Sequence, residues 1–267
     1  MDQKQRNELA LEFANIASEA GKLILASYKS ERTVHLKSDN SPVSRADTDA
    51  EQLICQRLVA LMPDVLVIAE ESFAGIPGGL PSERFLLVDP LDGTREFLAG
   101  RNEFTVNIAL IEARQPVVGA IYAPAFGQLY LAGATAFEAQ VPPGATLASL
   151  KAASIIASSP VPESGLRAIG SRSHMDLETE RWLQRLPVAE LQLAGSSLKF
   201  CLIARGDADV YPRLAPTMEW DTAAGHAILD AAGGCVVALD GSPLRYGKTA
   251  AGLKNHGFVA WGRQPPQ

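Results

Sequence analysis

The sequence is poor in features that mark several large protein classes. Its three cysteines, Cys55, Cys201 and Cys235, are far apart and form no C-x-x-C pair, which argues against a disulfide framework and a thiolate zinc site. No apolar run approaches the roughly 18 residues that a membrane span needs. The polar residues 1–6 lack the apolar core of a signal peptide. We therefore expect a cytoplasmic protein without an integral membrane segment.

Positive charge is also scarce. The chain has 24 Lys and Arg residues against 30 Asp and Glu residues, a net charge of −6. This balance gives no general attraction to phosphate backbones, so nucleic acid is not an expected partner. An acidic protein can still bind a small anion where bound cations or helix N-termini invert the local field. The length of 267 residues, 47% hydrophobic, is enough for one large or two fused domains with a substantial core.

Hydrophobic spacing divides the chain into an N-terminal half, 1–150, and a C-terminal half, 151–267. The boundary is placed in residues 133–151, which contain P-P-G and few charges. In the first half, helices are predicted at 7–28 and from Asp47 to Pro63. Its predicted strands, of which the last three form an antiparallel meander, are 65–69, 85–88, 105–111, 117–122 and 129–131.

Strands and helices alternate in the second half. The predicted strands are 153–157 and 191–194, and the predicted helices are 175–186, 197–205 and 221–232. Alternation of this kind is typical of a layered α/β arrangement. The predicted fold class is α/β (α+β), with two sheets, helices packed on each, and a cleft between the halves.

The strongest chemical signal is the hexapeptide D-P-L-D-G-T at residues 89–94, which follows a buried apolar strand. Pro90 is predicted to stop the strand, and Gly93 permits a sharp turn. Such a turn can direct Asp89, the Leu91 carbonyl and Asp92 at one point. Oxygen ligands of this type suit Mg²⁺. The alternative is an ordinary tight surface turn, which uses the same residue types.

Three further acids could join this turn. Glu70 follows the strand 65–69, and strand ends meet at the crevice where ligands bind in parallel or mixed sheets. Asp221 and Asp47 each precede a helical pattern, so each is also a plausible N-cap. If Glu70, Asp89, Asp92 and Asp221 converge, they cannot all remain ionised without cations. Two or three Mg²⁺ ions would resolve the repulsion and attract phosphate.

These residues resemble the lithium-sensitive, magnesium-dependent phosphatase superfamily that includes inositol monophosphatase. The resemblance is carried by D-P-L-D-G-T at 89–94 and by W-D-T-A-A-G at 220–225, in the expected order. Within the superfamily, the chain is most similar to the 3′(2′),5′-bisphosphate nucleotidases, because Thr94 is followed by R-E-F whereas inositol monophosphatases usually have Asn at position 96. Other supporting segments are 39–43, 103–110, 122–124, 171–174, 195–201 and 211–213.

The resemblance implies a layered αβαβα sandwich and a set of site residues. Mg²⁺ is expected on Glu70, Asp89, the Leu91 carbonyl, Asp92 and Asp221, and Thr94 with Asp47 is expected to activate the attacking water. The implied substrate contacts are Gly93, Thr94, His174, Ser196, Lys199, Arg213 and Asp221.

From the residues themselves, Lys199 and Arg213 are cations available for a second phosphate, and the Gly195 and Ser196 amides are expected to be free for an anion. Arg172 is interpreted as a surface charge, and Trp220 and Tyr211 as packing residues.

The expected activity is direct hydrolysis of the 3′-phosphate of 3′-phosphoadenosine 5′-phosphate, linked to sulfate assimilation and nucleotide recycling. One Mg²⁺ on Glu70 and Asp89 would activate water, and a second on Asp89, Asp92 and Asp221 would neutralise the leaving oxygen. An inositol or sugar phosphatase and a non-catalytic magnesium- or nucleotide-binding module are the alternatives. The resemblance also implies inhibition by Li⁺, and it leaves open a homodimer and docking on the cytoplasmic side of the inner membrane.

Overall fold

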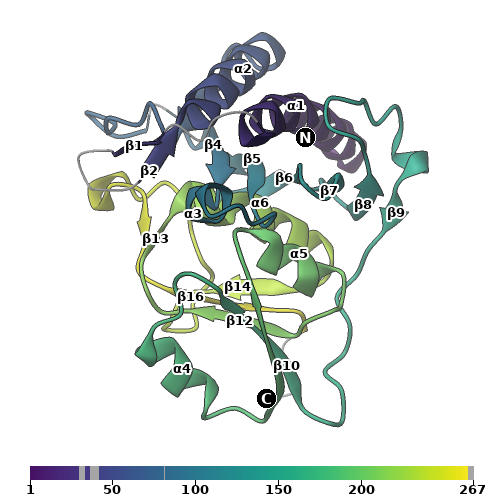
Figure 1. Ribbon diagram of the computed structural model, residues 1–267, viewed down its shortest axis with the longest axis vertical. Coiled ribbons are helices and arrows are strands. Elements are labelled where there is room, and N and C mark those ends of the chain that lie inside the picture. Colours follow the sequence, from purple (N-terminus) through teal and green to yellow (C-terminus); the bar gives the residue numbers. More distant parts are fainter. Residues whose placement is uncertain (30–33, 37–41, 81, 264–267) are drawn as a thin grey trace.

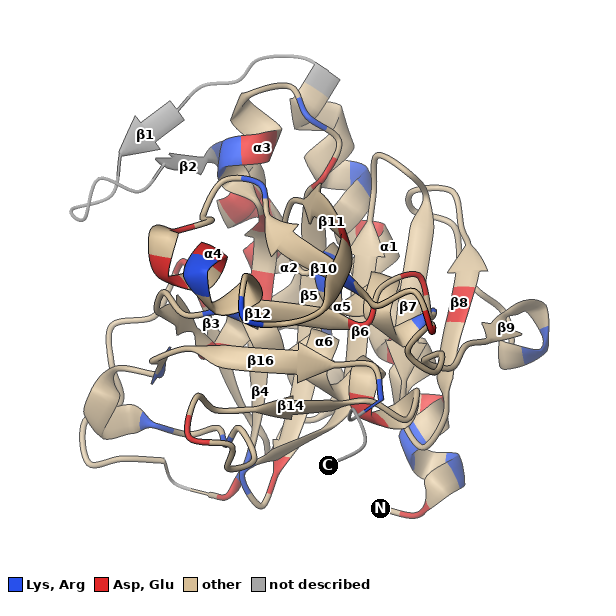
Figure 2. Ribbon diagram, turned by 90° about the horizontal axis from the view of Figure 1, so that it is seen from below, with Lys and Arg blue, Asp and Glu red and all other residues tan. Residues whose placement is uncertain are grey.

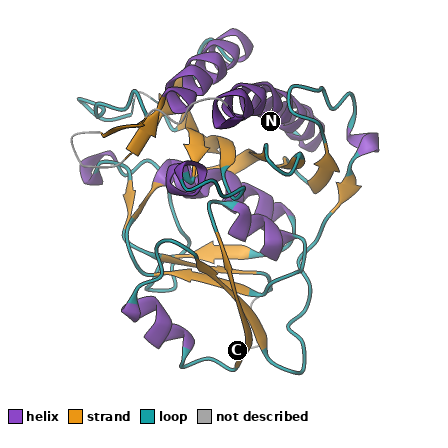
Figure 3. Ribbon diagram, viewed as in Figure 1, coloured by secondary structure: helices purple, strands orange, loops and turns teal. Residues whose placement is uncertain are grey.

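The computed structural model describes residues 1–29, 34–36, 42–80 and 82–263, and the chain forms five alternating layers of helix and sheet (Figures 1 and 3). The larger sheet has seven strands in the order β3-β4-β5-β6-β7-β8-β9, with β3 parallel to β4 and every other pair antiparallel. These strands are β3 (Leu66–Ala69), β4 (Arg84–Asp92), β5 (Thr105–Glu112), β6 (Gln115–Ala123), β7 (Gln128–Ala132), β8 (Ala136–Gln140) and β9 (Ser154–Ile155).

The outer face of this sheet is covered by two long helices, α1 (Gln3–Lys29) and α2 (Arg45–Leu61). Their apolar stripes, which include Phe13, Ile24 and Ile54, are fully buried against the sheet. A two-stranded hairpin of β1 (Val34–Leu36) and β2 (Pro42–Ser44) precedes α2. Residues 39–41 of the segment cited for the family resemblance lie outside the described residues.

A second, five-stranded sheet runs in the order β11-β10-β12-β16-β14, and Figure 2 shows β12, β16 and β14 side by side. Helices α5 (Leu198–Ala204) and α6 (Glu219–Ala231) lie between the two sheets, and α4 (Leu177–Leu183) covers the outside of the second. The strands are β10 (Leu166–Ser171), β11 (Val188–Ala194), β12 (Val210–Arg213), β14 (Cys235–Val237) and β16 (Phe258–Trp261). The short elements are α3 (Thr94–Leu98), β13 (Thr217–Met218) and β15 (Lys254–Asn255), with single 3₁₀ turns at Leu150–Ala152 and Thr249–Ala251.

The continuous apolar run of β4 follows from this layering. Phe85 and Leu87 face the core between the sheets, whereas Leu86 and Val88 face the core under α1 and α2. Because both faces are buried, the strand has no polar positions between Arg84, its first residue, and Asp89. The predicted layered fold is therefore confirmed. Among the described residues, no helix is long and apolar enough to cross a membrane.

Helix α6 lies unusually close to its neighbours because small residues face them. A Cβ on Gly119 of β6 would lie 2.6 Å from the Ala224 carbonyl oxygen, and a Cβ on Gly225 would lie 2.5 Å from the Phe200 ring of α5. The small residues of the A-A-G stretch at 223–225 therefore let the helix approach closely. It fixes the N-terminus of α6, which carries Asp221, against the larger sheet.

Several predicted strand limits are wrong, and a strand within 133–151 was not predicted. Strand β4 continues past Pro90 to Asp92, because the register shifts between Asp89 and Asp92 and the proline, which has no N–H, sits in that irregularity. The stretch 133–151 contains β8, which pairs with β7 and extends the larger sheet. The strand predicted at 153–157 covers only Ser154–Ile155, and it pairs with β8 across the predicted domain boundary.

Candidate active site

Parallel pairing of β3 and β4 brings two acids to the same edge of the larger sheet. Ala69 is the register partner of Val88, and the Glu70 amide donates to the Val88 carbonyl at 3.1 Å. Glu70 therefore follows the last ladder pair, directly beside Asp89. The Glu51 carboxylate of α2 accepts the Glu71 amide at 2.7 Å, which fixes the loop after Glu70 to the outer helix layer.

The irregularity after Asp89 shapes the loop that carries the remaining ligands. Asp89 is 1% exposed, and one of its oxygens accepts the Leu91 amide at 3.0 Å. The strand resumes at Asp92, opposite Thr105. Gly93 then adopts φ 90°, a left-handed conformation that favours glycine, and α3 begins at Thr94. The predicted sharp turn at Gly93 is confirmed.

Thr94 and Asp47 meet beneath this loop. The Thr94 hydroxyl oxygen lies 3.2 Å from Asp47 Oδ1 and 3.1 Å from the Leu91 carbonyl oxygen. A hydroxyl has one proton, so these two acceptors share it and the hydroxyl lone pairs are left for other donors. Asp47 is 1% exposed and lies in the first turn of α2, two residues after Arg45 starts the helix. The N-cap alternative for Asp47 is therefore wrong.

Asp221 is also not an N-cap. It is the third residue of α6, and its carboxylate reaches back to accept the Met218 amide at 2.9 Å and the Thr217 hydroxyl. An acid at this position caps the helix from within, as in a capping box. The two contacts occupy one of its oxygens and direct the carboxylate toward the strand ends that carry Glu70 and Asp89.

Three of these carboxylates form a cluster. One oxygen from each of Glu70, Asp89 and Asp221 lies within 4.8 Å of the others. Burial, and then the charges of Glu70, Asp92 and Asp221, raise the pKa of Asp89 well above its ordinary value. Burial, and then the charge of Asp221, raise the pKa of Asp92 to about 7, although Lys199, Arg213 and the Ser197 amide act in the opposite direction. The cluster therefore carries a repulsion that divalent cations would relieve.

The cluster forms the floor of a cleft of about 420 Å³ that is bordered by both sheets. Every predicted ligand and substrate contact lines it, while Asp47 lies behind Thr94. Desolvation, followed by the positive charges of Arg213 and Arg95, lowers the pKa of His174. The predicted packing role of Tyr211 and Trp220 agrees with their burial, although both rings also border the cleft.

The turn at Gly195 and Ser196 differs from the sequence expectation. The Gly195 amide is not free, because it donates to Glu103 Oε2 at 2.8 Å, and the Ser197 amide donates to the Asp92 carboxylate. Lys199 is 2% exposed, and its ammonium donates to the carbonyl oxygens of Ala194, at 3.3 Å, and Ser196. Its charge therefore lies under the turn rather than in open solution.

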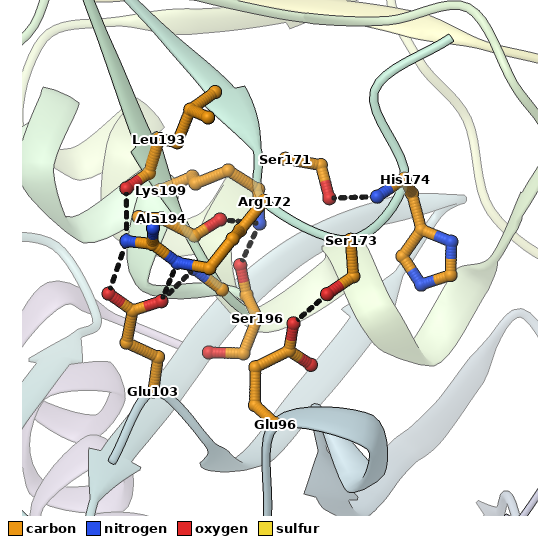
Figure 4. Close-up of polar contacts among 11 residues, drawn as sticks. Glu96, Glu103, Ser171, Arg172, Ser173, His174, Leu193, Ala194, Ser196 and Lys199 are labelled. Atoms are coloured by element: carbon orange, nitrogen blue, oxygen red, sulfur yellow. Dashed lines mark hydrogen bonds and ion pairs between the residues drawn. The ribbon is translucent and has the colours of Figure 1, made fainter. Parts of the chain in front are cut away.

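Sequence reasoning missed a set of contacts between the two sheets, shown in Figure 4. Arg172, interpreted above as a surface charge, forms a two-pronged ion pair with Glu103. Its hydrogen bonds lower the pKa of Glu103, which is therefore ionised at neutral pH. The buried Glu96 accepts the Ser173 hydroxyl. The partners are separated by 69 and 77 positions, so no local pattern could reveal them.

Comparison with known proteins gives a consistent result. A sequence model of the inositol monophosphatase family matches residues 5–261. The chain is 40% identical over 236 residues to the 3′(2′),5′-bisphosphate nucleotidase CysQ of Escherichia coli K12, covering 86% of this chain and 91% of that protein. It is 39% identical over 248 residues to the enzyme of the same name from Buchnera aphidicola, covering 92% of this chain and 90% of that protein.

Solved structures agree with the sequence comparison. The crystal structure of CysQ from Bacteroides thetaiotaomicron, a bacterial member of the inositol monophosphatase family, superposes with a TM-score of 0.83. The two chains are 36% identical, and the match covers 97% of this chain and 98% of that one. The similarity therefore includes both sheets, all the helical layers and the cleft.

Proposed function

The chain belongs to the inositol monophosphatase family, and from this premise we propose that it hydrolyses the 3′-phosphate of 3′-phosphoadenosine 5′-phosphate to give AMP and phosphate. The observation that carries the proposal is the convergence of Glu70, Asp89 and Asp221 within 4.8 Å, next to the hydrogen-bonded Thr94 and Asp47. The chain spans about nine-tenths of the curated nucleotidases that it matches, which supports the same activity in this protein.

The donor set supports Mg²⁺ as the cofactor. All the candidate ligands are oxygens: the carboxylates of Glu70, Asp89, Asp92 and Asp221 and the Leu91 carbonyl, a set that suits a hard cation. Burial and the neighbouring carboxylates raise the pKa values of Asp89 and Asp92, so a bound cation would relieve the repulsion among these acids. When bound, two or three Mg²⁺ ions would supply an acidified water and neutralise charge on the leaving oxygen.

The chain's own residues would move the proton and orient the phosphate. The Thr94 hydroxyl is held by Asp47, so it can accept a proton from the attacking water while its own proton passes toward Asp47. The backbone amides of Gly93 and Thr94, which follow the loop at the edge of the cleft, would stabilise charge on the phosphate oxygens. This arrangement requires no covalent phosphoryl-enzyme intermediate.

Two orphaned polar atoms support a substrate with a second anionic group. Among the described residues, Ser196 Oγ and Arg213 Nε are buried without a hydrogen-bond partner, and both residues line the cleft. A buried unpaired donor is costly, so a ligand that pairs with it gains affinity. Arg213 and Lys199 would attract the 5′-phosphate, and His174, whose lowered pKa keeps it neutral at pH 7, would donate or accept a hydrogen bond.

A phosphate-release assay over a panel of esters tests the proposal. We expect Mg²⁺-dependent turnover of 3′-phosphoadenosine 5′-phosphate at least tenfold above that of inositol 1-phosphate, judged by kcat/KM. A tenfold preference for the inositol or a sugar phosphate would reassign the substrate. Absence of phosphate release from every ester would favour a non-catalytic magnesium- or nucleotide-binding module.

Other features stay predictions. Lithium is expected to inhibit the enzyme, in keeping with the family resemblance. A homodimer, a cytoplasmic location, peripheral docking on the inner membrane and the division into halves at residue 150 are likewise expectations that separate experiments would test.

A further inference from the structure

Two tight turns from different sheets lie side by side at the cleft, since a Cβ on Gly93 would lie 3.3 Å from the Ser196 Cβ. One contains Gly93, beside the metal-ligand loop, and the other contains Gly195 and Ser196. Both are packed against Glu103: a Cβ on Gly93 would lie 3.0 Å from the Glu103 carbonyl oxygen, and a Cβ on Gly195 would lie 2.8 Å from the same atom. The Glu103 backbone therefore packs against both turns, next to the place where they meet.

The Glu103 side chain holds the second turn directly. Its carboxylate accepts the Gly195 amide at 2.8 Å and two N–H groups of Arg172 at 2.8 and 2.9 Å. The Arg172 guanidinium also donates to the Leu193 carbonyl at 2.7 Å, so it joins the same carboxylate to the end of β11 (Figure 4). These four hydrogen bonds connect Glu103, directly or through Arg172, to Leu193 and Gly195, the residues on either side of Ala194.

The turn that is held in this way is strained. Ser196 has φ 48°, a left-handed conformation that serine rarely adopts. Such a conformation persists only where its surroundings over-determine it. Glu103 and Arg172 hold it on one side, and on the other the Lys199 ammonium donates to the carbonyl oxygens of Ala194 and Ser196. The outcome is that the buried Ser196 hydroxyl, without a partner among the described residues, borders the cleft.

We propose that Glu103 and Arg172 are positioning residues that fix the Ser196 turn over the cleft, and thereby determine how tightly the part of the substrate beyond the scissile phosphate is held. Neither residue is among those lining the cleft, so each acts through the turn. The inference rests on the proposed function for its substrate, but the geometry of the turn does not depend on that choice. The two side chains hold the turn and are not among the metal-ligand carboxylates, so their loss should affect binding of a large ester more than the metal-ligand cluster.

The test uses Glu103→Gln and Arg172→Lys in the full-length protein. Each keeps the approximate size of the side chain but removes the two-pronged ion pair. Glu19→Gln is the matched control, because Glu19 of α1 forms the same two-pronged ion pair with Arg57 of α2, and neither residue lines the cleft. Kinetics are measured on 3′-phosphoadenosine 5′-phosphate and on glycerol 2-phosphate, a small ester that lacks the nucleoside and the second phosphate. Hydrogen exchange of residues 193–199 is measured without substrate.

For Glu103→Gln we expect KM for the bisphosphate nucleotide to rise about tenfold while kcat stays within threefold, and kcat/KM for glycerol 2-phosphate to stay within twofold. Arg172→Lys should show a smaller rise. Exchange in residues 193–199 should accelerate at least fivefold in Glu103→Gln and remain unchanged in Glu19→Gln. Equal losses on both esters, or unchanged exchange in this segment, would overturn the proposal. If the wild-type protein releases no phosphate from the nucleotide, the proposed function fails, while hydrogen exchange still decides the positioning role.

Discussion

Replacing one of the crowded acids should stabilise the protein when divalent cations are absent. Asp92 is a candidate ligand whose pKa is raised to about 7, first by burial and then by the charge of Asp221. Its folded-state pKa is thus above the unfolded value of about 3.9, so the folded state binds more protons between these values. Stability is therefore lost as pH rises from about 4 to 7. The change Asp92→Asn removes the group that causes this loss.

The size of the effect follows from the pKa difference. A shift of about three units corresponds to an upper limit of roughly 4 kcal/mol at pH 8, and less than half of that at pH 5. For a chain of this length, 1 kcal/mol moves Tm by roughly 2 °C, so we expect Asp92→Asn to raise Tm by about 4–8 °C at pH 8 in a chelator. Its phosphatase activity should be lost, because a ligand is lost.

Differential scanning calorimetry at pH 5 and pH 8, with EDTA and with 10 mM Mg²⁺, provides the measurement. Asp64→Asn, in the exposed turn after α2, is the control for removing a negative charge. With Mg²⁺ the wild-type protein should have the higher Tm of the two, because it gains stability from metal binding and Asp92→Asn gains less. If Asp92→Asn lowers Tm equally at both pH values in EDTA, the carboxylates are not crowded and the metal assignment loses its support.

Four further changes test the site and its support. Thr94→Val and Asp47→Asn should each lower kcat at least a hundredfold, measured by phosphate release at saturating Mg²⁺, because general base catalysis contributes about 10²–10⁴; Tm should change little in Thr94→Val. Arg213→Gln should raise KM for the bisphosphate nucleotide at least tenfold and spare glycerol 2-phosphate, and equal effects on both esters would contradict its role at the second phosphate. Gly119→Ala should lower stability by about 1–3 kcal/mol in urea titrations, because its Cβ would meet the Ala224 carbonyl oxygen at 2.6 Å.

The layered fold and the acids of the site were predictable because their signals are local. The buried run Phe85–Val88 ends in D-P-L-D-G-T, and the small residues at 223–225 indicate a helix that packs closely. By contrast, β12 was missed because its four residues include Pro212 and Arg213, which resemble a loop. Its strand character comes from pairing with β16, from Arg213 opposite Phe258 to Val210 opposite Trp261, and such distant partners leave no local pattern.

The exact position of an acid at a helix start was less predictable. Asp221 and Asp47 were both assigned alternative roles as N-caps, and both lie inside the first turn instead. The two placements have the same sequence signal, because an acid can accept first-turn amides from the N-cap position or reach back to the N-cap amide from the third helical position. The ion pair of Glu103 and Arg172 had no sequence signal at all, since each residue alone is typical of an exposed loop.

The placement of α6 between both sheets also determines how substrate enters and leaves. One face of this helix touches β5 and β6, another approaches β14, and its first turn supplies Asp221 to the same cluster as Glu70 and Asp89. Because α6 is fixed against the larger sheet, the three carboxylates stay together, whereas a hinge motion that separated the sheets would expose the apolar core around α5 and α6. We therefore expect the proposed substrate and its products to enter and leave through the open mouth of the cleft, without separation of the two sheets.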